Sequence, residues 1–164
     1  MKNVEKNIVE GKVALVTGRT GALGTVLCQL LAEAGARLVL PYRDPEKLEH
    51  LLGSLPKGCE VRHTAADVTR EEDVERAVGL ALQAWGQVDI LCNLAGGYLP
   101  GRPLWETPPA SWDALMGINA RSAYLCMRAV LPGMIERASG RVVSVAAKVA
   151  AARPPKAAAY AASK

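Results

Sequence analysis

Short apolar runs alternate with longer amphipathic stretches along most of the chain. Residues 13–17 are rich in β-branched side chains and predict a strand, and 22–34 carry leucines at helical spacing up to Gly35, which is expected to end that helix. The alternation continues with strands predicted at 37–40, 59–65, 88–96 and 140–147, and helices from Pro45, over 67–85 and from about Ser111. Strands that alternate with helices favour an α/β fold with a doubly wound, mostly parallel sheet in one domain over residues 1–164.

Three glycines, Gly18, Gly21 and Gly24, lie between the first predicted strand and the first predicted helix. Glycines at this turn let the backbone approach a pyrophosphate closely, and the N-terminus of the helix supplies amide donors and positive charge. The stretch therefore predicts a phosphate-binding loop of a Rossmann-like nucleotide domain. The alternative is a turn that is glycine-rich for purely conformational reasons.

Composition and charge argue against several kinds of partner. Half of the 164 residues are hydrophobic and 22% are charged, as in ordinary globular domains. No run approaches the ~20 apolar residues that span a bilayer, and the first residues lack the apolar core of a signal peptide, so we expect a cytoplasmic protein with no membrane partner. The net charge of +4 is spread along the chain and aromatic residues are only 4%, which argues against nucleic-acid binding.

The cysteines and histidines do not form a metal-binding pattern. They are scattered, with no C-x-x-C pair and no histidine near a cysteine, at Cys28, Cys59, Cys92, Cys126, His50 and His63. We predict free, mostly buried thiols and no metal site.

Five motifs occur in an order that resembles the short-chain dehydrogenase/reductase family. The stretch 17–24, TGRTGALG, is similar to the family's TGxxxGxG loop, with the middle glycine shifted to Gly21 and Ala22 in its usual place. The others are ADVT at 66–69, NLAG at 93–96 with Leu94 in place of an asparagine, Asn119 within WDALMGINARS, and YAASK at 160–164.

The resemblance implies an NAD(P)-dependent oxidoreductase, expected as a homo-oligomer, that moves a hydride between NADP(H) and a small carbonyl, alcohol or quinonoid substrate. It implies the catalytic residues Asn119, Tyr160 and Lys164. The cofactor-binding residues that it implies, the last two catalytic ones included, are Gly18, Arg19, Thr20, Gly21, Leu23, Gly24, Arg43, Asp67, Val68, Asn93, Ala95, Gly96, Tyr160 and Lys164.

Tyr160 and Lys164 are four positions apart, so on a helix they share one face. A lysine cation close to a phenol favours the phenolate form and makes the tyrosine a usable proton donor or acceptor. The resemblance further implies that Lys164 holds the nicotinamide ribose and that Asn119 supports a water-linked proton path.

Arg43 follows the second predicted strand, where the ribose of a dinucleotide binds, and Tyr42 occupies the place of an acid that would bind a 2′-hydroxyl. An arginine there attracts a 2′-phosphate, so NADP(H) is favoured and NAD(H) is the alternative. Asp44, next to Arg43, opposes this attraction. A solvated loop arginine is the other interpretation.

The sequence departs from the family pattern at Ala147, thirteen positions before the tyrosine, where a serine usually binds the substrate carbonyl. Ser144, on the same predicted strand, is expected to face the opposite side. The segment before the tyrosine is similar to the dihydropteridine reductase branch, which also lacks this serine.

Further residues near the predicted site remain open to two interpretations. Tyr98 and Trp105 follow the fourth predicted strand, where they either stack on a flat substrate or pack within the loop. Lys148, Arg153 and Lys156 either attract an acidic substrate or form a solvated face. Because the sequence ends at Lys164, inside the motif helix, we expect the N-terminal part of an enzyme. The alternatives are a non-catalytic nucleotide-binding regulator and an inactive fragment.

Overall fold

The computed structural model describes residues 8–19, 21–99, 101–152 and 154–164. Its five strands are all parallel and form one sheet in the order β3-β2-β1-β4-β5. The strands are β1 Val13–Thr17, β2 Arg37–Tyr42, β3 Val61–Ala65, β4 Ile90–Asn93 and β5 Arg141–Ser144. This confirms the predicted doubly wound sheet. The strand order reverses between β1 and β4, which is where such sheets bind ligands.

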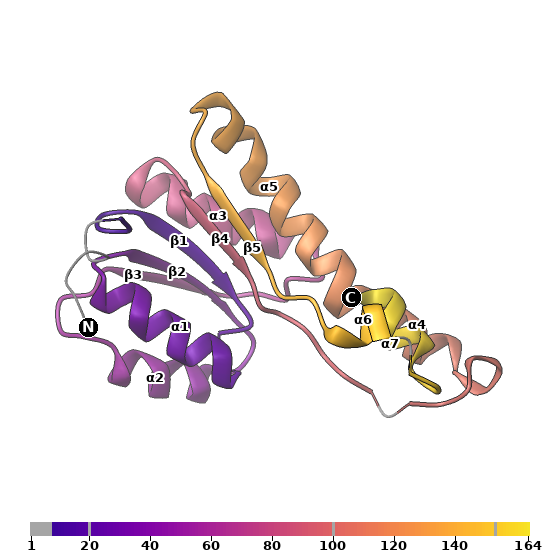
Figure 1. Ribbon diagram of the computed structural model, residues 1–164. Coiled ribbons are helices and arrows are strands. Elements are labelled where there is room, and N and C mark those ends of the chain that lie inside the picture. The colour runs from indigo at the N-terminus through magenta and orange to yellow at the C-terminus, as the bar shows by residue number, and fades with distance from the viewer. Residues whose placement is uncertain (1–7, 20, 100, 153) are drawn as a thin grey trace.

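Helices cover both faces of the sheet (Figure 1). The helical segments are α1 Ala22–Glu33, α2 Pro45–Ser54, α3 Glu71–Trp85, η1 Leu104–Glu106, α4 Pro109–Leu115, η2 Met116–Arg121, α5 Ser122–Glu136, α6 Lys148–Ala152 and α7 Ala158–Ser163. α1 and α2 pack on one face, α3 and α5 on the other, and α4, α6 and α7 lie beyond the carboxyl end of the strands (Figure 1).

The core follows from the period-2 alternation of side chains along β1. Val13 and Leu15 pack with the helices α3 and α5, whereas Ala14 and Val16 pack with α1 and α2. All four side chains are at most 1% exposed. A strand that is apolar on both faces is what a central parallel strand between two helical layers requires.

Most predicted boundaries agree with the structure. α1 ends at Glu33, and Gly35 follows in the left-handed conformation at φ +83°, as expected of a glycine after a helix. α2 begins at Pro45 after the cap Asp44. The second strand continues beyond the predicted Leu40, because β3 pairs with β2 as far as Tyr42.

The bounds of three predicted strands are corrected. The predicted strand 59–65 begins only at Val61 and the predicted strand 88–96 covers only Ile90–Asn93. The predicted strand 140–147 ends at Ser144, because its partner β4 ends at Asn93 and the Asn93–Ser144 pair is the last in the register. Since the chain leaves the strand there, the expectation that Ser144 and Ala147 face opposite sides of one strand is wrong.

The thiols lie as predicted. Cys28, Cys92 and Cys126 are buried, Cys59 is partly exposed, and all four are free. Burial raises the pKa of Cys28 and of Cys126 to about 12, so neither is a reactive thiolate near neutral pH. Within the described ranges, no group of three or more His, Cys, Asp or Glu side chains is arranged to hold a metal ion, and none of the helices has the length and apolar character needed to cross a membrane.

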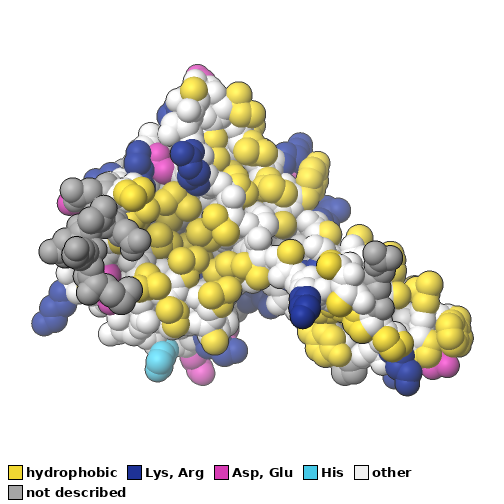
Figure 2. Space-filling view, in the orientation of Figure 1, with side chains coloured by type: hydrophobic (Ala, Val, Ile, Leu, Met, Phe, Trp, Pro, Cys, Tyr) yellow, Lys and Arg dark blue, Asp and Glu magenta, His cyan; other side chains and the backbone are white. Residues whose placement is uncertain are grey.

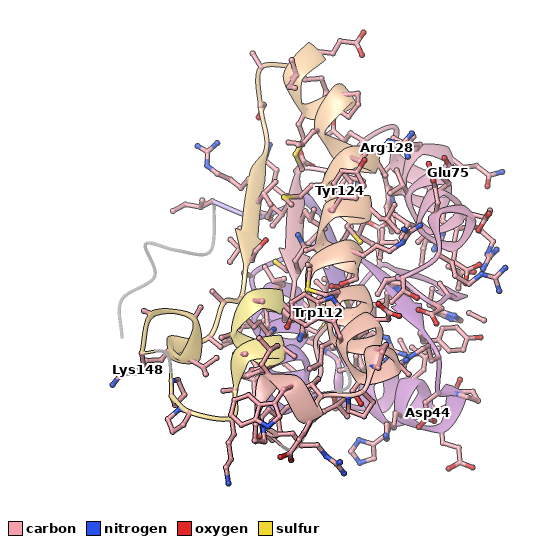
Figure 3. All side chains as sticks on the ribbon, turned by 90° about the vertical axis from the view of Figure 1, so that its right-hand side faces the viewer. Asp44, Glu75, Trp112, Tyr124, Arg128 and Lys148 are labelled. Atoms are coloured by element: carbon pink, nitrogen blue, oxygen red, sulfur yellow. The ribbon has the colours of Figure 1, made fainter. Side chains whose placement is uncertain are left out.

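One face of the molecule carries exposed hydrophobic side chains. Figure 2 shows hydrophobic side chains spread over the face on which α1 and β5 lie. Those with the largest exposed fractions on these elements and just after β5 are Leu23, Val26, Leu30, Val142, Val143 and Val145. On the opposite face, Arg128 of α5 forms an ion pair with Glu71 of α3, and Figure 3 shows Arg128 beside these helices.

Candidate active site

A cavity of about 650 Å³ opens at the carboxyl ends of β1, β2 and β4, where the strand order reverses. Seven of the residues predicted to bind a cofactor line it: Gly18, Arg19, Gly21, Arg43, Val68, Ala95 and Gly96. The glycine-rich loop, the end of β2, the turn after β3 and the NLAG motif therefore meet at one hollow. This is the position at which open α/β sheets bind nucleotides.

Two glycines shape the loop that borders this cavity. Gly18 has a φ of +66°, and a Cβ there would overlap the backbone of Leu94 and Ala95. A Cβ on Gly24 would lie 2.5 Å from both the Cα of Arg19 and the carbonyl oxygen of Gly18. Neither position accepts a side chain unless the backbone moves. The loop is thus closely packed against β4 and the first turn of α1, as a phosphate-binding loop requires.

Thr17, which the sequence analysis did not single out, connects the loop to the end of β4. Its hydroxyl accepts hydrogen bonds from the amides of Leu94 and Ala95, both at 3.2 Å, and donates to the carbonyl oxygen of Cys92 at 3.4 Å. Thr17 is 1% exposed. Its only sequence signal is its place directly before the first glycine of the loop.

Arg19 is a buried cation on the cavity wall, with 1% of its surface exposed. Its Nε donates to the carbonyl oxygen of Pro41 at 3.1 Å, while its two terminal nitrogens have no hydrogen-bond partner in the described part of the chain. Burial lowers the pKa of the guanidinium. Because a buried cation with free donors is stabilised by an anion, a phosphate-bearing nucleotide fits this cavity.

Arg43 is exposed at the rim of the same cavity, and its acidic neighbour Asp44 is paired with Lys47. Asp44 caps α2, where its side chain accepts a hydrogen bond from the Lys47 amide at 3.2 Å and lies 3.4 Å from the Lys47 ammonium. The hydrogen bond from this amide holds the pKa of Asp44 below its usual value. The carboxylate, labelled in Figure 3, caps α2, and the ammonium of Lys47 offsets part of the negative charge that it brings to the cavity.

Among the described residues, the others predicted to bind the cofactor do not line this cavity. Leu23 is exposed on α1, whereas Asp67 accepts hydrogen bonds from the amide and the hydroxyl of Thr69 at 3.0 and 2.8 Å. Asn93 is buried and donates to the Ser144 hydroxyl at 3.1 Å. The contacts of Asp67 and Asn93 hold the turns around the cavity. Thr20 and Arg153 lie outside the described residues.

Asn119 lies in the π-helical segment η2, between α4 and α5. Such segments occur frequently at functional sites. Its buried side chain accepts a hydrogen bond from the amide of Gly97 at 2.8 Å, and donates to the carbonyl oxygen of Gly97 at 3.0 Å and to the Ser163 hydroxyl at 2.9 Å. Asn119 thus connects the loop after β4 to α7.

Tyr160 and Lys164 come from the last residues of the sequence, and Lys164 reaches the NLAG motif and Asn119. A Cβ on Gly96 would lie 2.7 Å from the Lys164 Nζ and 2.9 Å from the Asn119 Oδ1, so both groups gather over Gly96. Burial lowers the pKa of Lys164. The ring of Tyr160 packs edge-on against that of Tyr98, with 5.1 Å between ring centres. The structure therefore brings Asn119 and Lys164 together beside the nucleotide cavity.

Ser163 is a second residue that the sequence analysis missed. It is 4% exposed, donates a hydrogen bond from its hydroxyl to the carbonyl oxygen of Tyr160 at 2.8 Å, and accepts one from Asn119. It therefore fixes the helical turn that carries Tyr160. A hydroxyl side chain in an otherwise alanine-rich helix is the only signal by which the sequence marks it.

The position of Ala147 lies in the segment between β5 and α6. The preceding hydroxyl, that of Ser144, is engaged at the sheet edge by Asn93. Ala147 itself offers only its backbone, whose carbonyl oxygen accepts a hydrogen bond from the amide of Ala150 at 3.0 Å. No side-chain donor stands at this position to hold a carbonyl oxygen.

Comparison with known sequences identifies related proteins. The sequence profile of the family described as short chain dehydrogenase matches residues 12–164. An uncharacterised oxidoreductase of Staphylococcus aureus (strain MW2) is 32% identical over 139 residues, covering 85% of this chain and 59% of that protein. An uncharacterised oxidoreductase of Listeria monocytogenes is 32% identical over 157 residues, covering 95% and 63%. This chain thus spans less than two thirds of the length of these relatives.

Crystal structures of similar proteins also include short-chain dehydrogenases or oxidoreductases. NAD+-bound xylitol dehydrogenase is similar with a TM-score of 0.89 and 35% identity, over 96% of this chain and 61% of that one. A metagenomic short-chain oxidoreductase in complex with NADP has a TM-score of 0.88 and 34% identity, over 95% and 71%. The matched residues include the glycine-rich loop, Asn119, Tyr160 and Lys164. The chain belongs to the short-chain dehydrogenase family.

Proposed function

We propose that the protein transfers a hydride between NADP(H) and a small carbonyl or alcohol substrate, with Tyr160 as the proton donor or acceptor. The observation that carries this proposal is the position of Lys164. Its ammonium lies over Gly96 on the wall of the nucleotide cavity, while Tyr160 of the same helix lines a second hollow. A protein that only bound a nucleotide would have no need of a phenol and an ammonium group placed in this way.

A nicotinamide bound in the cavity would supply the hydride for reduction of the carbonyl carbon. The carbonyl oxygen takes the phenolic proton of Tyr160, so an alcohol forms and the tyrosine becomes a phenolate. The positive charge of Lys164 stabilises that phenolate. Asn119 acts as a positioning residue, because its hydrogen bonds hold Gly97 and Ser163 around the pair.

Removal of the phenolic hydroxyl tests this assignment. Tyr160→Phe should lower turnover by about 10²–10⁴-fold, the usual contribution of a general acid, with nearly unchanged cofactor affinity. Lys164→Ala should lower both turnover and affinity. Turnover is followed by NADPH absorbance and affinity by cofactor fluorescence. Tyr98→Phe is the matched control, because it removes a hydroxyl from the neighbouring ring. Equal activity of Tyr160→Phe and the parent protein would refute the assignment.

Three features of the cavity support NADP(H) over NAD(H). Arg19 has two free buried donors, Arg43 stands at the rim, and Tyr42 occupies the place where an acid would bind a 2′-hydroxyl. Guanidinium groups bind phosphate by paired hydrogen bonds. The similar crystal structures hold either NAD+ or NADP, so they are compatible with both cofactors.

Separate substitutions of Arg43 and Arg19 test the cofactor preference. In the protein, NADPH should bind more tightly than NADH, and Arg43→Asp should reverse this order. Arg19→Met should weaken NADPH binding by about tenfold or more, as the loss of a charge-assisted hydrogen bond predicts. Arg62→Gln, a change at an exposed arginine of β3, serves as control. If both cavity variants keep the preference of the parent protein, the arginines do not set it.

Ala147 supports a second candidate substrate class, namely quinonoid or imine-like conjugated rings. Such substrates are already polarised, whereas a simple ketone lacks the usual hydroxyl partner here. The loss of one such donor costs about 10²–10³-fold in rate. Turnover of quinonoid dihydropterin should therefore exceed that of simple ketones, and Ala147→Ser should raise ketone turnover. Fast ketone turnover by the parent protein, with no gain from the serine, would exclude this class.

A further inference from the structure

A second hollow lies beside Tyr160, between the loop after β4 and the segment that precedes α7. Its volume is about 40 Å³. On the same measure one water needs about 10–15 Å³, so the hollow accepts a group of the size of a carboxylate but not a large ring. Because Tyr160 forms part of its wall, a substrate group held here is close to the proposed proton donor.

The charged side chains on the wall of this hollow are Arg102 and Lys156, and the hydroxyls of Thr107 and Ser111 accompany them. The described residues that line it include no Asp or Glu. Nor does either cation form an ion pair with any carboxylate of the described ranges. The hollow thus carries unbalanced positive charge, which attracts an anion.

The backbone of Lys156 is held in an unusual conformation. Its φ is +61°, in the left-handed region that residues with a Cβ rarely adopt. A Cβ on Gly101 would overlap the carbonyl oxygen of Lys156, so the two segments are in direct backbone contact. Strained conformations of this kind persist where the surroundings impose them, and they concentrate at ligand sites. The contact places Arg102, the residue after Gly101, close to the segment of Lys156.

Lys148, a further lysine near the motif helix, has a different place. Lys148 is exposed on α6 and projects away from the body of the molecule (Figure 3). It does not line the hollow, whereas Lys156 does. Of Lys148 and Lys156, only Lys156 therefore lies on the wall of the hollow that Tyr160 also lines.

We infer that the substrate is a small oxo acid or hydroxy acid, whose carboxylate is held by Arg102 and Lys156 while its carbonyl or hydroxyl group faces Tyr160. This inference rests on the proposed function, because Tyr160 defines where the reacting oxygen lies. In the reduction, the carbonyl carbon gains a hydride from NADPH and its oxygen gains the proton of Tyr160. The carboxylate is unchanged and its charge stays beside the two cations.

Binding of matched probes to the protein tests the inference independently of turnover. Pyruvate, levulinate and 5-oxohexanoate are each compared with their methyl esters by saturation-transfer NMR in the presence of NADPH. At least one acid should bind more tightly than its ester, and only the binding of the acid should weaken with added salt. The preferred chain length reports the span between Tyr160 and the cations. Oxidation of NADPH, followed separately, tests the proposed hydride transfer.

Variants then assign the binding to the two cations. Lys156→Asn and Arg102→Gln should each weaken acid binding by about threefold to fivefold, as for exposed charge pairs, and the double variant by about tenfold. Asparagine tolerates the left-handed backbone, so Lys156→Asn removes the ammonium group and shortens the side chain without adding backbone strain. Lys156→Arg keeps the positive charge and should retain binding of the acid. Lys57→Asn, at a distant exposed lysine, is the control. Gly101→Ala should weaken binding without removing any charge. Equal binding of acids and esters, no binding of any acid, or full binding by the double variant would overturn the inference.

Discussion

β1 and β5 are parallel strands of the same sheet, yet every residue of β1 is buried and every residue of β5 is exposed. β1 lies between β2 and β4 and has helices on both faces, whereas β5 pairs only with β4 within the described ranges. The nucleotide cavity lies at the end of the buried strands. Tyr160 instead belongs to α7, which Lys164 directly follows, beyond the end of the sheet, where α4 and α6 are the neighbours of α7 (Figure 1).

The two regions therefore position their functional groups by different means. The cavity is shaped by backbone contacts, such as those of Gly18 with the segment after β4 and of Gly24 with the loop. The region around α7, which carries Tyr160, depends on a few side-chain hydrogen bonds, those of Asn119 and Ser163. Changes in the first region should thus affect the whole fold, and changes in the second should have local effects.

The largest effect is expected at Gly24. Gly24→Ala places a methyl group 2.5 Å from the backbone of Arg19 and Gly18, which should cost about 3 kcal/mol of stability and abolish nucleotide binding. Thermal unfolding and cofactor fluorescence measure both effects. Gly79→Ala, in the middle of α3 with no atom within 4 Å of the new methyl group, should instead stabilise the chain by about 0.5–1 kcal/mol. A Gly24→Ala protein with parental affinity would show that the loop is not closely packed.

Two valines compare the strands directly. Val16→Ala, at a side chain with 0% exposure in β1, should lower the free energy of unfolding by about 2 kcal/mol through lost burial and a small cavity. Val143→Ala, at 53% exposure in β5, should change it by less than about 0.5 kcal/mol. Urea unfolding of both variants measures the difference. Equal losses would mean that β5 is covered in solution.

A local effect is expected from Asn119→Ala. The variant leaves Ser163 and the Gly97 backbone without their buried partner, so amide exchange in α7 should accelerate by about tenfold, with a smaller change in global unfolding. Hydrogen exchange followed by mass spectrometry distinguishes faster exchange in α7 from a change in global unfolding. Ser122→Ala, which removes a hydroxyl that donates to the carbonyl oxygen of Ile118 in the preceding segment η2, should leave α7 unaffected. Unchanged exchange in the Asn119 variant would remove its positioning role.

The smallest effect concerns acid stability. Asp73 accepts a hydrogen bond from the Asp67 amide at 2.7 Å, and this bond lowers its pKa from the usual 3.8. Its stabilising contribution is therefore present above pH 3.8 and is lost as the pH falls through the folded-state pKa. Asp73→Asn should flatten the dependence of the unfolding midpoint on pH in this acid range, whereas Glu49→Gln should not. Identical profiles of Asp73→Asn and the parent protein would contradict this.

The spacing of hydrophobic positions was sufficient to predict the α/β fold. Strands buried on both faces consist of continuous apolar runs, and the helices carry leucines at helical spacing. Boundaries were predicted less well. The end of β5 depends on where its partner β4 ends, and the sequence of β5 does not contain that information. The π-helical segment around Asn119 has no local sequence pattern at all.

By itself, the sequence determined which residue types are available to the site and where along the chain the turns occur: the glycines after the first strand, Arg43 after the second, and the Tyr160–Lys164 spacing. Only the tertiary structure decided which of these meet. It buried Arg19 with two free donors, turned Asp44 into a helix cap, and set Arg102 and Lys156 on one wall with Tyr160. The physical reason is that burial, hydrogen-bond satisfaction and charge balance depend on neighbours that are distant in the chain.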